Sequence, residues 1–497
     1  MDEDIRGGEA AVARLVQGAP LEEALDVANP GAWTALDVAV RARAWYRPEE
    51  LPDRAWAERE SSAGRGLFSF VRRRSGSAPS ARSGLSAVPS ARSGRSAPSA
   101  RSGSSAEPRL ALALCHPDGR TREAALARSA QHPALLPLVI VRAADWAAPV
   151  RDRARELLRK CLDPDTAVAL APLILRVGRR DRGAYAVELL GEVLRQAPPH
   201  GRAASLFVHP DRRVRRFAYR LACEAGLLSP GRLARTAARD EDVVVQTLCA
   251  DACLAAVRES GHYDDVLEPL LAAPSPRARS AGVTALRPAG RSERGVEFLA
   301  DRSALVRACA RYVVRQGGAD PLPWYRRCAQ AGDPALPPGA VAGLAECGDR
   351  GDAALLRPLL AHPVPAVRAR AVAGLRVLDV MDVERIRPLL DDPAPGVVRE
   401  AAAALLPSAA LLPEAWLMEH LAPERPPRAR LAAYRLLEAR GGIVRLRAAV
   451  SLLGDPDARL RTRAARAVRG WYPPEVREDE EGSALLARAR HVFAGGC

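Results

Sequence analysis

One arginine-centred pattern recurs along most of this 497-residue chain and restricts its fold more than any other feature. An arginine, or in a few places a glycine or glutamine, is followed three residues later by alanine, glycine or cysteine, every 28 to 33 residues. We call the first residue of each pattern the anchor; the anchors are Arg122, Arg151, Gly183, Arg215, Gln246, Arg279, Arg307, Gly339, Arg368, Arg399, Arg430 and Arg461. A period of about 31 residues is typical of a solenoid, whose units bury their apolar sides against one another. The sequence therefore predicts an all-α fold, an α-solenoid of about twelve helical hairpins.

The stretch 352–378 illustrates one unit. Leucine pairs at 355–356 and 359–360 form an apolar stripe at helical spacing. The sequence from His362 to Pro365 ends that helix, because proline has no N–H to donate and disfavours helix in the preceding residue. We expect a second helix from about Ala366 that buries Val367, Ala371, Gly374 and Leu375. Such a hairpin cannot cover its own apolar faces, so it needs neighbours.

Two features accompany the anchors. A histidine or aspartate lies six residues before many of them, at His116, Asp145, His209, Asp240, Asp301, Asp333, His362 and Asp455. A valine often directly precedes the arginine, as in Val150-Arg151, Val214-Arg215, Val306-Arg307, Val367-Arg368 and Val398-Arg399. An acid in the turn can accept N–H bonds at the start of the second helix, where the helix dipole favours negative charge. We expect the anchor arginine to bond turn carbonyls or the aspartate of an adjacent repeat, which would give a ladder along the stack.

These turn and anchor motifs, with prolines before aliphatic residues in the first helices, resemble the HEAT-repeat family over about 110–470. They are most similar to its short units named after the phycocyanobilin lyases (PBS lyases), within the armadillo-like helical class. The resemblance implies stacked hairpins whose second helices line a concave groove. It implies no particular activity, because a shared repeat does not transfer a function.

Composition agrees with helix-on-helix packing. Hydrophobic residues make up 48% of the chain but aromatic residues only 4%, so small side chains supply most of the apolar surface. No run of about 18 apolar residues occurs, so we expect no membrane insertion. The acidic, polar N-terminus does not read as a signal peptide. The nine cysteines form no CxxC pair; we interpret them as reduced thiols at small core positions and expect a cytoplasmic protein.

The distribution of charge suggests the domain organisation. The net charge of +15 divides into −6 for residues 1–60, +8 for 61–109 and +13 for the remainder. We expect a helical cap or divergent repeat at 1–60, with helices near 9–17 and 32–46. A Ser/Ala/Arg/Gly/Pro-rich basic tether or insertion at 61–108 is expected to be disordered, because it lacks large apolar residues. The solenoid then covers 109–472, and an acidic segment with a capping helix covers 473–497.

No constellation of catalytic residues emerges. His116, His209 and His362 occupy equivalent turns of separate repeats, and the remaining histidines show no metal-ligand spacing. No phosphate-binding glycine loop or nucleophile elbow is present. We therefore expect no metal, no cofactor and no enzymatic activity. HEAT-like DNA glycosylases place Trp, Asp and Arg near a flipped base, but Asp145, Trp146 and Trp324 match no such motif, and we interpret both tryptophans as packing residues.

One face of the second helices is the candidate binding surface. If the residues one before and three, six and seven after the anchor are buried, those one, five and eight after it face the other way. This surface is net basic, and its candidate binding residues are Arg216, Arg220, Tyr312, Arg315, Arg435, Arg466 and Arg469. We expect a monomeric scaffold or adaptor that binds a protein partner there. The alternative is a nucleic-acid-binding protein, including a HEAT-like DNA glycosylase, that follows a phosphate backbone. An ordinary solvated face that carries the arginine bias of the chain accounts for the same residues equally well, and a bilin- or cofactor-modifying enzyme is the third functional hypothesis.

Overall fold

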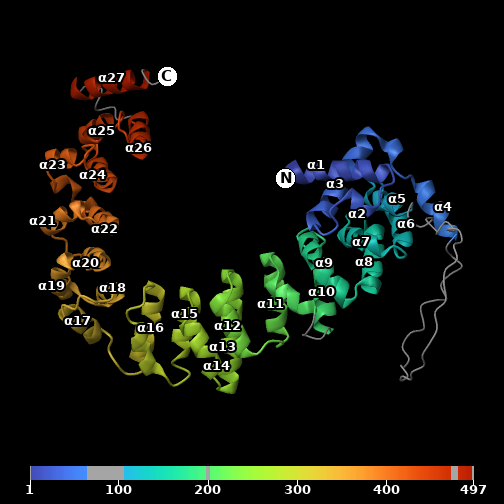
Figure 1. Cartoon of the computed structure of the whole chain (residues 1–497), viewed down its shortest axis with the longest axis horizontal. Helices are drawn as coiled ribbons and strands as arrows, with labels where there is room; N and C mark the ends of the chain where they lie inside the picture. The colour runs from blue at the N-terminus through green and yellow to red at the C-terminus, as the bar shows by residue number, and fades with distance from the viewer. Residues whose placement is uncertain (1, 64–105, 197–201, 472–479, 495–497) are drawn as a thin grey trace, which may run out of the picture. The chain divides into compact units, whose positions relative to one another are not determined.

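The computed structural model describes residues 2–63, 106–196, 202–471 and 480–494, and within them the chain forms helices and no strands. The chain divides into two compact units, residues 1–228 and 229–497. Each unit consists of helices that pack in chain order, mostly as antiparallel hairpins (Figure 1). The all-α, solenoid-type fold expected from the repeat is thus confirmed.

Unit 1 begins with helices that precede the first anchor and continues with hairpins. Its elements are α1 (Asp2–Val16), α2 (Leu21–Ala24), α3 (Pro30–Tyr46), η1 (Pro48–Glu50), α4 (Arg54–Ala63), α5 (Ala106–Cys115), α6 (Gly119–Ser129), η2 (Pro133–Leu135), α7 (Leu136–Arg142), α8 (Ala148–Cys161), α9 (Pro164–Val177), α10 (Ala184–Gln196), η3 (Arg202–Val208) and α11 (Arg212–Glu224). The helices expected near 9–17 and 32–46 are α1 and α3. Helix α3 contacts α5, α7 and α9, the first helices of three successive hairpins. The N-terminal helices therefore lie along the stack as well as beside its first member.

Unit 2 continues the same alternation of first and second helices. Its elements are α12 (Pro230–Arg239), α13 (Val243–Ser260), α14 (Asp264–Leu271), α15 (Pro276–Ala285), η4 (Ser292–Phe298), α16 (Ala304–Gln316), α17 (Leu322–Gln330), α18 (Pro338–Cys347), η5 (Arg350–Asp352), α19 (Ala353–Leu356), η6 (Pro358–Ala361), α20 (Pro365–Val377), α21 (Val383–Ile386), η7 (Arg387–Asp391), α22 (Pro395–Leu405), η8 (Leu406–Leu411), α23 (Glu414–Glu419), α24 (Pro427–Arg440), α25 (Gly442–Ser451), α26 (Ala458–Arg469) and α27 (Glu480–Ala494). Second helices contact one another in succession, as α18 with α20, α20 with α22, and α22 with α24.

The unit at 352–378 forms the expected hairpin with one difference. Helix α20 begins at Pro365 and buries Val367, Ala371, Gly374 and Leu375, as predicted. The first helix is not continuous, because α19 ends at Leu356 and the chain continues from Pro358 as the 3₁₀ turn η6. The proline ring at Pro358 cannot donate to the preceding turn, so the chain tightens there.

The predicted ladder of anchor arginines is present. In the first hairpin, Arg122 donates to Asp145 through Nε at 3.0 Å and through its second terminal nitrogen at 2.8 Å. Its remaining nitrogen donates to the carbonyls of His116 and Pro117, both at 2.7 Å. Asp145 in turn accepts the N–H of Ala147 at 3.0 Å, at the start of the next second helix. One guanidinium thus joins the turn of its own hairpin to the turn of the next.

Unit 2 repeats this arrangement. Arg279 binds Asp301 at 2.9 Å, and Arg368 binds Asp392 at 2.7 and 2.8 Å. Both arginines also donate to carbonyls of their own turns. Burial disfavours the charged form of Asp392, but the hydrogen bonds from Arg368 and the N–H of Ala394, with the charge of Arg368, together outweigh it, so the pKa of this carboxyl lies below its usual value. Arg122, Arg279 and Arg368 are therefore structural, because paired buried charges hold neighbouring turns together. Arg151 and Arg461 bond the carbonyls of their own turns.

One anchor was placed wrongly by the sequence. Arg399 lies on the surface with a side chain 70% exposed and contacts only its neighbour Glu400, at 3.3 Å. Val398 is 2% exposed and holds the equivalent buried place, six residues after Asp392, the turn acid that Arg368 binds. The repeat therefore has valine as its anchor, and Arg399 is the next, outward-facing residue. The six-residue spacing from the turn acid, and not the identity of the residue as arginine, marks the anchor of this repeat.

The glycine anchors have a steric cause. A Cβ at Gly339 would lie 2.0 Å from the carbonyl oxygen of Ala300, and one at Gly183 would lie 2.2 Å from that of Val177. At Gly339, α18 approaches the preceding segment too closely for any side chain. Gly183 precedes α10, where the turn brings the backbone back against the end of α9. The neighbouring Arg307 turns instead to Glu346 in α18, which also receives Arg311 at 2.7 Å.

Several expectations concern parts of the chain with limited description. Most of the tether expected at 61–108 lies outside the described residues, and α5 already begins at Ala106. At the other end, the helix expected within 473–497 is α27. The cysteines of the described chain are free, but only Cys115, Cys249 and Cys253 are buried and Cys161 is exposed, so the core placement holds for part of them. No helix of the described residues is long and apolar enough to cross a bilayer.

Candidate functional site

The second helices of unit 2 share a face that is turned away from the hairpin core and toward solvent. Positions one and five after the anchor are exposed or half-buried in α13, α15, α16, α20, α24 and α26, while the opposite side of each helix is buried. Helix α18 is the exception, because Ala340 and Leu344 are buried there. In the stretch from α19 to α24, helices α20, α22 and α24 lie on the inner side of the curve that their hairpins make (Figure 1). We call this surface the second-helix face.

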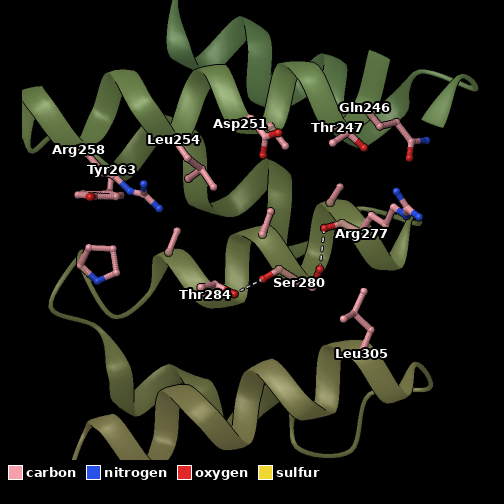
Figure 2. A pocket seen from close by; sticks show the side chains of 15 residues that line it. Gln246, Thr247, Asp251, Leu254, Arg258, Tyr263, Arg277, Ser280, Thr284 and Leu305 are labelled. Atoms are coloured by element: carbon pink, nitrogen blue, oxygen red, sulfur yellow. Dashed lines mark hydrogen bonds between the residues drawn. The ribbon is translucent and has the colours of Figure 1, made fainter. Parts of the chain in front are cut away.

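A groove of about 460 Å³ crosses the second-helix face between α13 and α15 and reaches Leu305 of α16 (Figure 2). Its α13 wall carries Thr247, Asp251 and Leu254, which follow one another along the helix. Its α15 wall carries small side chains, namely Ala278, Ser280, Ala281, Thr284 and Ala285. Larger side chains at these positions would fill the space, so the groove exists because the α15 wall carries small residues.

The polar groups of the groove are arranged along its length. Thr247 donates its hydroxyl to the carbonyl of Val243 at 2.9 Å, and Thr284 donates to that of Ser280 at 2.7 Å. Each hydroxyl oxygen keeps lone pairs that can accept hydrogen bonds from a ligand. Asp251 stands exposed between them, while Arg258 and Arg277 lie toward opposite ends (Figure 2). An elongated ligand with N–H donors and a small or basic side chain fits this order of groups.

Two groups of predicted binding residues precede α18. In unit 1, α11 carries Arg220, which is exposed, and Arg216, which is half-buried. In unit 2, α16 carries Tyr312 and Arg315, both exposed. Tyr312 accepts a hydrogen bond from Arg287 of the neighbouring segment at 2.9 Å, and the guanidinium lies 6.0 Å from the ring centre. Tyr312 therefore already has a cationic partner within the fold.

The other predicted residues lie at the C-terminal end of unit 2. Arg435 of α24 and Arg466 of α26 lie on the same face of neighbouring second helices, five residues after their anchors. Their helices are joined by Arg463, which pairs with Glu438 at 2.6 Å. Arg469 is exposed, but its guanidinium lies 5.2 Å from the ring of Phe493 in α27, so it faces that helix.

Three arginines that sequence reasoning missed belong to the same surface. Arg399 joins it once the anchor of α22 is Val398, and Arg428 and Arg459 lie two residues before their anchors. Positions −2 and +5 are seven residues apart, so they share one side of a helix. We call the set the basic strip; it comprises Arg399, Arg428, Arg435, Arg459 and Arg466. The signal that would have found Arg428 and Arg459 is this seven-residue spacing.

The residues compared with glycosylase chemistry have structural roles or surface positions. Asp145 is 4% exposed and is held by Arg122 and by Arg142 at 2.9 Å. Burial raises the pKa of Asp145 and these arginines lower it by more, so the carboxylate stays ionised and paired. Trp146 is 62% exposed and so lies outside the core, but its ring centre is 5.6 Å from the guanidinium of Arg122 in the preceding hairpin, an inter-repeat contact. Trp324 is half-buried against Tyr325. The described residues contain no cluster of three or more metal-ligating side chains.

Repeated hairpins, a ladder of turn carboxylates and a shared second-helix face define this chain as an all-α protein of the solenoid type. No protein-family model and no curated protein matches the sequence. Among solved structures, the chain is similar to importin beta, from a crystal structure in an ammonium sulfate condition, at 15% identity and a TM-score of 0.21. The match covers 78% of this chain and 56% of that one. At this TM-score the likeness carries no conclusion about partners or function.

Proposed function

We propose that this protein is a non-catalytic scaffold or adaptor that binds a protein partner on the second-helix face of unit 2. The groove between α13 and α15 carries the proposal, because it is elongated, lined by small side chains and bordered by hydrogen-bond acceptors. An extended peptide has the complementary properties, namely backbone N–H donors and side chains at regular intervals. The free thiols support a reducing compartment, and we propose the cytoplasm. The anchor ladder supports short repeats of the PBS-lyase type.

The test is selection of peptides from a random displayed library on the full-length protein. We expect enriched peptides that bind the wild type and lose at least about 10-fold in affinity with Thr284→Trp, because the indole fills the groove. Leu411→Trp is the matched control, since Leu411 is 75% exposed in η8 and lies outside the groove. Enriched peptides that bind both variants equally, or a library that yields none, would refute the groove as a binding site.

Nucleic-acid binding is the second candidate function, favoured by the exposed arginines of α11, α24 and α26. It predicts that nucleic acid co-purifies with the protein and is removed by nuclease, with binding that weakens steeply as salt rises. Changing Arg216, Arg220, Arg435 and Arg466 to glutamine should then abolish it. If those four changes leave DNA and RNA binding intact, these arginines do not form a nucleic-acid surface.

A further inference from the structure

The basic strip is an uneven distribution of charge on one face of unit 2. Toward its N-terminal side, the positions two before and one and five after the anchor of α20 are Ala366, Ala369 and Ala373. Those of α15 are Arg277, Ser280 and Thr284, so α15 carries one arginine among them, at one end of the groove. From α22 onward, each second helix carries arginine at one or two of these positions. Arg435, Arg459 and Arg466 form no ion pair within the described residues, and Arg399 has only the adjacent Glu400. The strip is therefore a local accumulation of positive charge, and it is separate from the groove.

The spacing of the strip is set by the packing of the solenoid. Helix α22 contacts α24, and the Arg463–Glu438 pair joins α26 to α24. Helices in contact lie about 8–10 Å apart, so the strip offers roughly one or two guanidinium groups per 9 Å along the stack. A ligand that crosses these helices must present its negative charges at a similar interval to meet one helix after another.

A polyproline-II segment meets this requirement. It rises about 3.1 Å per residue with three residues per turn, so every third side chain points the same way at intervals of about 9 Å. A β-strand does not, because its residues i and i+3 point to opposite faces. Resting on the proposed function, we infer that the basic strip binds an acidic, proline-containing segment of the partner in polyproline-II conformation, with a carboxylate or phosphate at every third residue.

The strip fits such a peptide better than a nucleic acid. Duplex DNA carries one charge per about 1.7 Å of its axis, far denser than the strip. Two carboxylates also lie among the arginines: Glu438 pairs with Arg463 and Glu400 neighbours Arg399. They would repel a continuous row of phosphates, whereas a peptide with neutral residues between its acids can avoid them. Leu431, 36% exposed between Arg428 and Arg435, offers an apolar contact to such a residue.

Fluorescent peptides test the inference by anisotropy with the full-length protein. The probe is four repeats of Ala-Pro-Glu; a second peptide has the same composition with its four glutamates adjacent, and a third has glutamine in place of glutamate. We expect the spaced peptide to bind at least about 5-fold tighter than the clustered one, and the glutamine peptide not to bind. Equal affinity of the spaced and clustered peptides would overturn the spacing, and equal binding of the glutamine peptide would overturn the role of charge.

Matched variants locate the binding. Arg399→Gln, Arg435→Gln and Arg466→Gln combined remove one charge from each of α22, α24 and α26, and should weaken the spaced peptide at least about 10-fold. The control removes three exposed charges from first-helix segments, at Arg327, Arg350 and Arg385, and should change the affinity less than about 2-fold. Circular dichroism confirms that both triple variants are folded. Equal losses in the two variants would mean that only net charge matters, and the inference would fail.

Two further experiments distinguish this inference from nucleic-acid binding by the strip and from peptide binding in the groove. A single-stranded oligonucleotide that binds more tightly than the spaced peptide and depends on the same three arginines would make the strip a nucleic-acid surface. Thr284→Trp should leave the spaced peptide unaffected, because Thr284 lies in the groove. If library peptides bind the groove but the spaced peptide does not bind the strip, the inference is wrong and the proposed function stands.

Discussion

Arg142 of α7 forms a buried ion pair with Asp37 of α3, although the two residues are 105 positions apart in the sequence. Both side chains are almost inaccessible, at 1% and 6% exposure. Arg142 also binds Asp145, so the pair extends the anchor ladder of the first hairpin to a helix that precedes it in the chain. Burial disfavours the charged form of Arg142, but Asp37 and its other neighbours outweigh this and raise its pKa.

Removal of this contact should destabilise unit 1. Asp37→Asn leaves the buried guanidinium with one carboxylate fewer, and we expect a loss of about 2–3 kcal/mol in the free energy of unfolding. Glu22→Gln is the control, because Glu22 is an exposed acid of α2. Urea denaturation followed by circular dichroism measures both. An Asp37→Asn variant as stable as the control would mean that α3 is held by its apolar contacts alone.

The corrected register of α22 predicts opposite outcomes for two arginines of neighbouring repeats. Arg368→Ala should cost about 2–4 kcal/mol, because it leaves Asp392 buried without its cation and breaks bonds to two turn carbonyls. Arg399→Ala should change stability by less than about 0.5 kcal/mol, because the side chain is exposed. Urea midpoints of the two variants decide the matter, and similar losses would restore Arg399 as an anchor.

A matched pair of glycines tests the close approach at α18. Gly339 and Gly396 each follow the proline that begins a helix, at Pro338 and Pro395. Gly339→Ala should destabilise the protein by more than about 2 kcal/mol, because its Cβ would overlap the backbone of Ala300. Gly396→Ala meets nothing within 4 Å and should be neutral or stabilise by up to about 1 kcal/mol. Thermal unfolding of both variants provides the comparison.

Much of the fold was predictable because residues close together in the sequence determine each hairpin. Turn acids, prolines and small residues all act within one hairpin, and the ladder joins hairpins adjacent in sequence, as Arg122 and Asp145 do. The contact of Asp37 with Arg142 was not predictable, since no local pattern pairs residues 105 positions apart. The partner of Arg307 was not predictable either, because Glu346 lies 39 positions away within α18 and not in a turn.

The candidate site was predictable only in outline. Helical periodicity placed Arg435 and Arg466 on one face, but Arg469 turns to Phe493 of a helix beyond the repeats, which the period does not describe. Arg399 was not predicted to face outward, because the sequence pattern assigned it as the anchor in place of Val398. The groove depends on the small side chains of Ser280 and Ala281. Because small residues are common throughout this chain, the sequence alone does not mark these two as part of a groove.

Acid should destabilise unit 2 through carboxylates with lowered pKa values. Burial disfavours the charged form of Glu346, but hydrogen bonds from Arg307 and Arg311 outweigh it, so its pKa in the folded protein lies below the usual value. An acid with a depressed folded pKa contributes stability that is present above its unfolded pKa of about 4.3 and is lost as pH falls through the folded value. The wild type should therefore lose stability progressively from about pH 5 downward. Glu346→Gln should be less stable at pH 7 yet lose less between pH 7 and pH 3, as measured by urea midpoints.

The exposed Glu293 in η4 provides the control for this pH dependence. Glu293→Gln should follow the wild-type pH profile, because its carboxylate forms no ion pair within the described residues. The Glu346→Gln curve must approach the wild-type curve as pH falls, since protonation of Glu346 removes the same charge that the substitution removes. Parallel curves for these two proteins from pH 7 to pH 3 would show that Glu346 has the same pKa in the folded and unfolded chain, and the ion pairs with Arg307 and Arg311 would then contribute no stability.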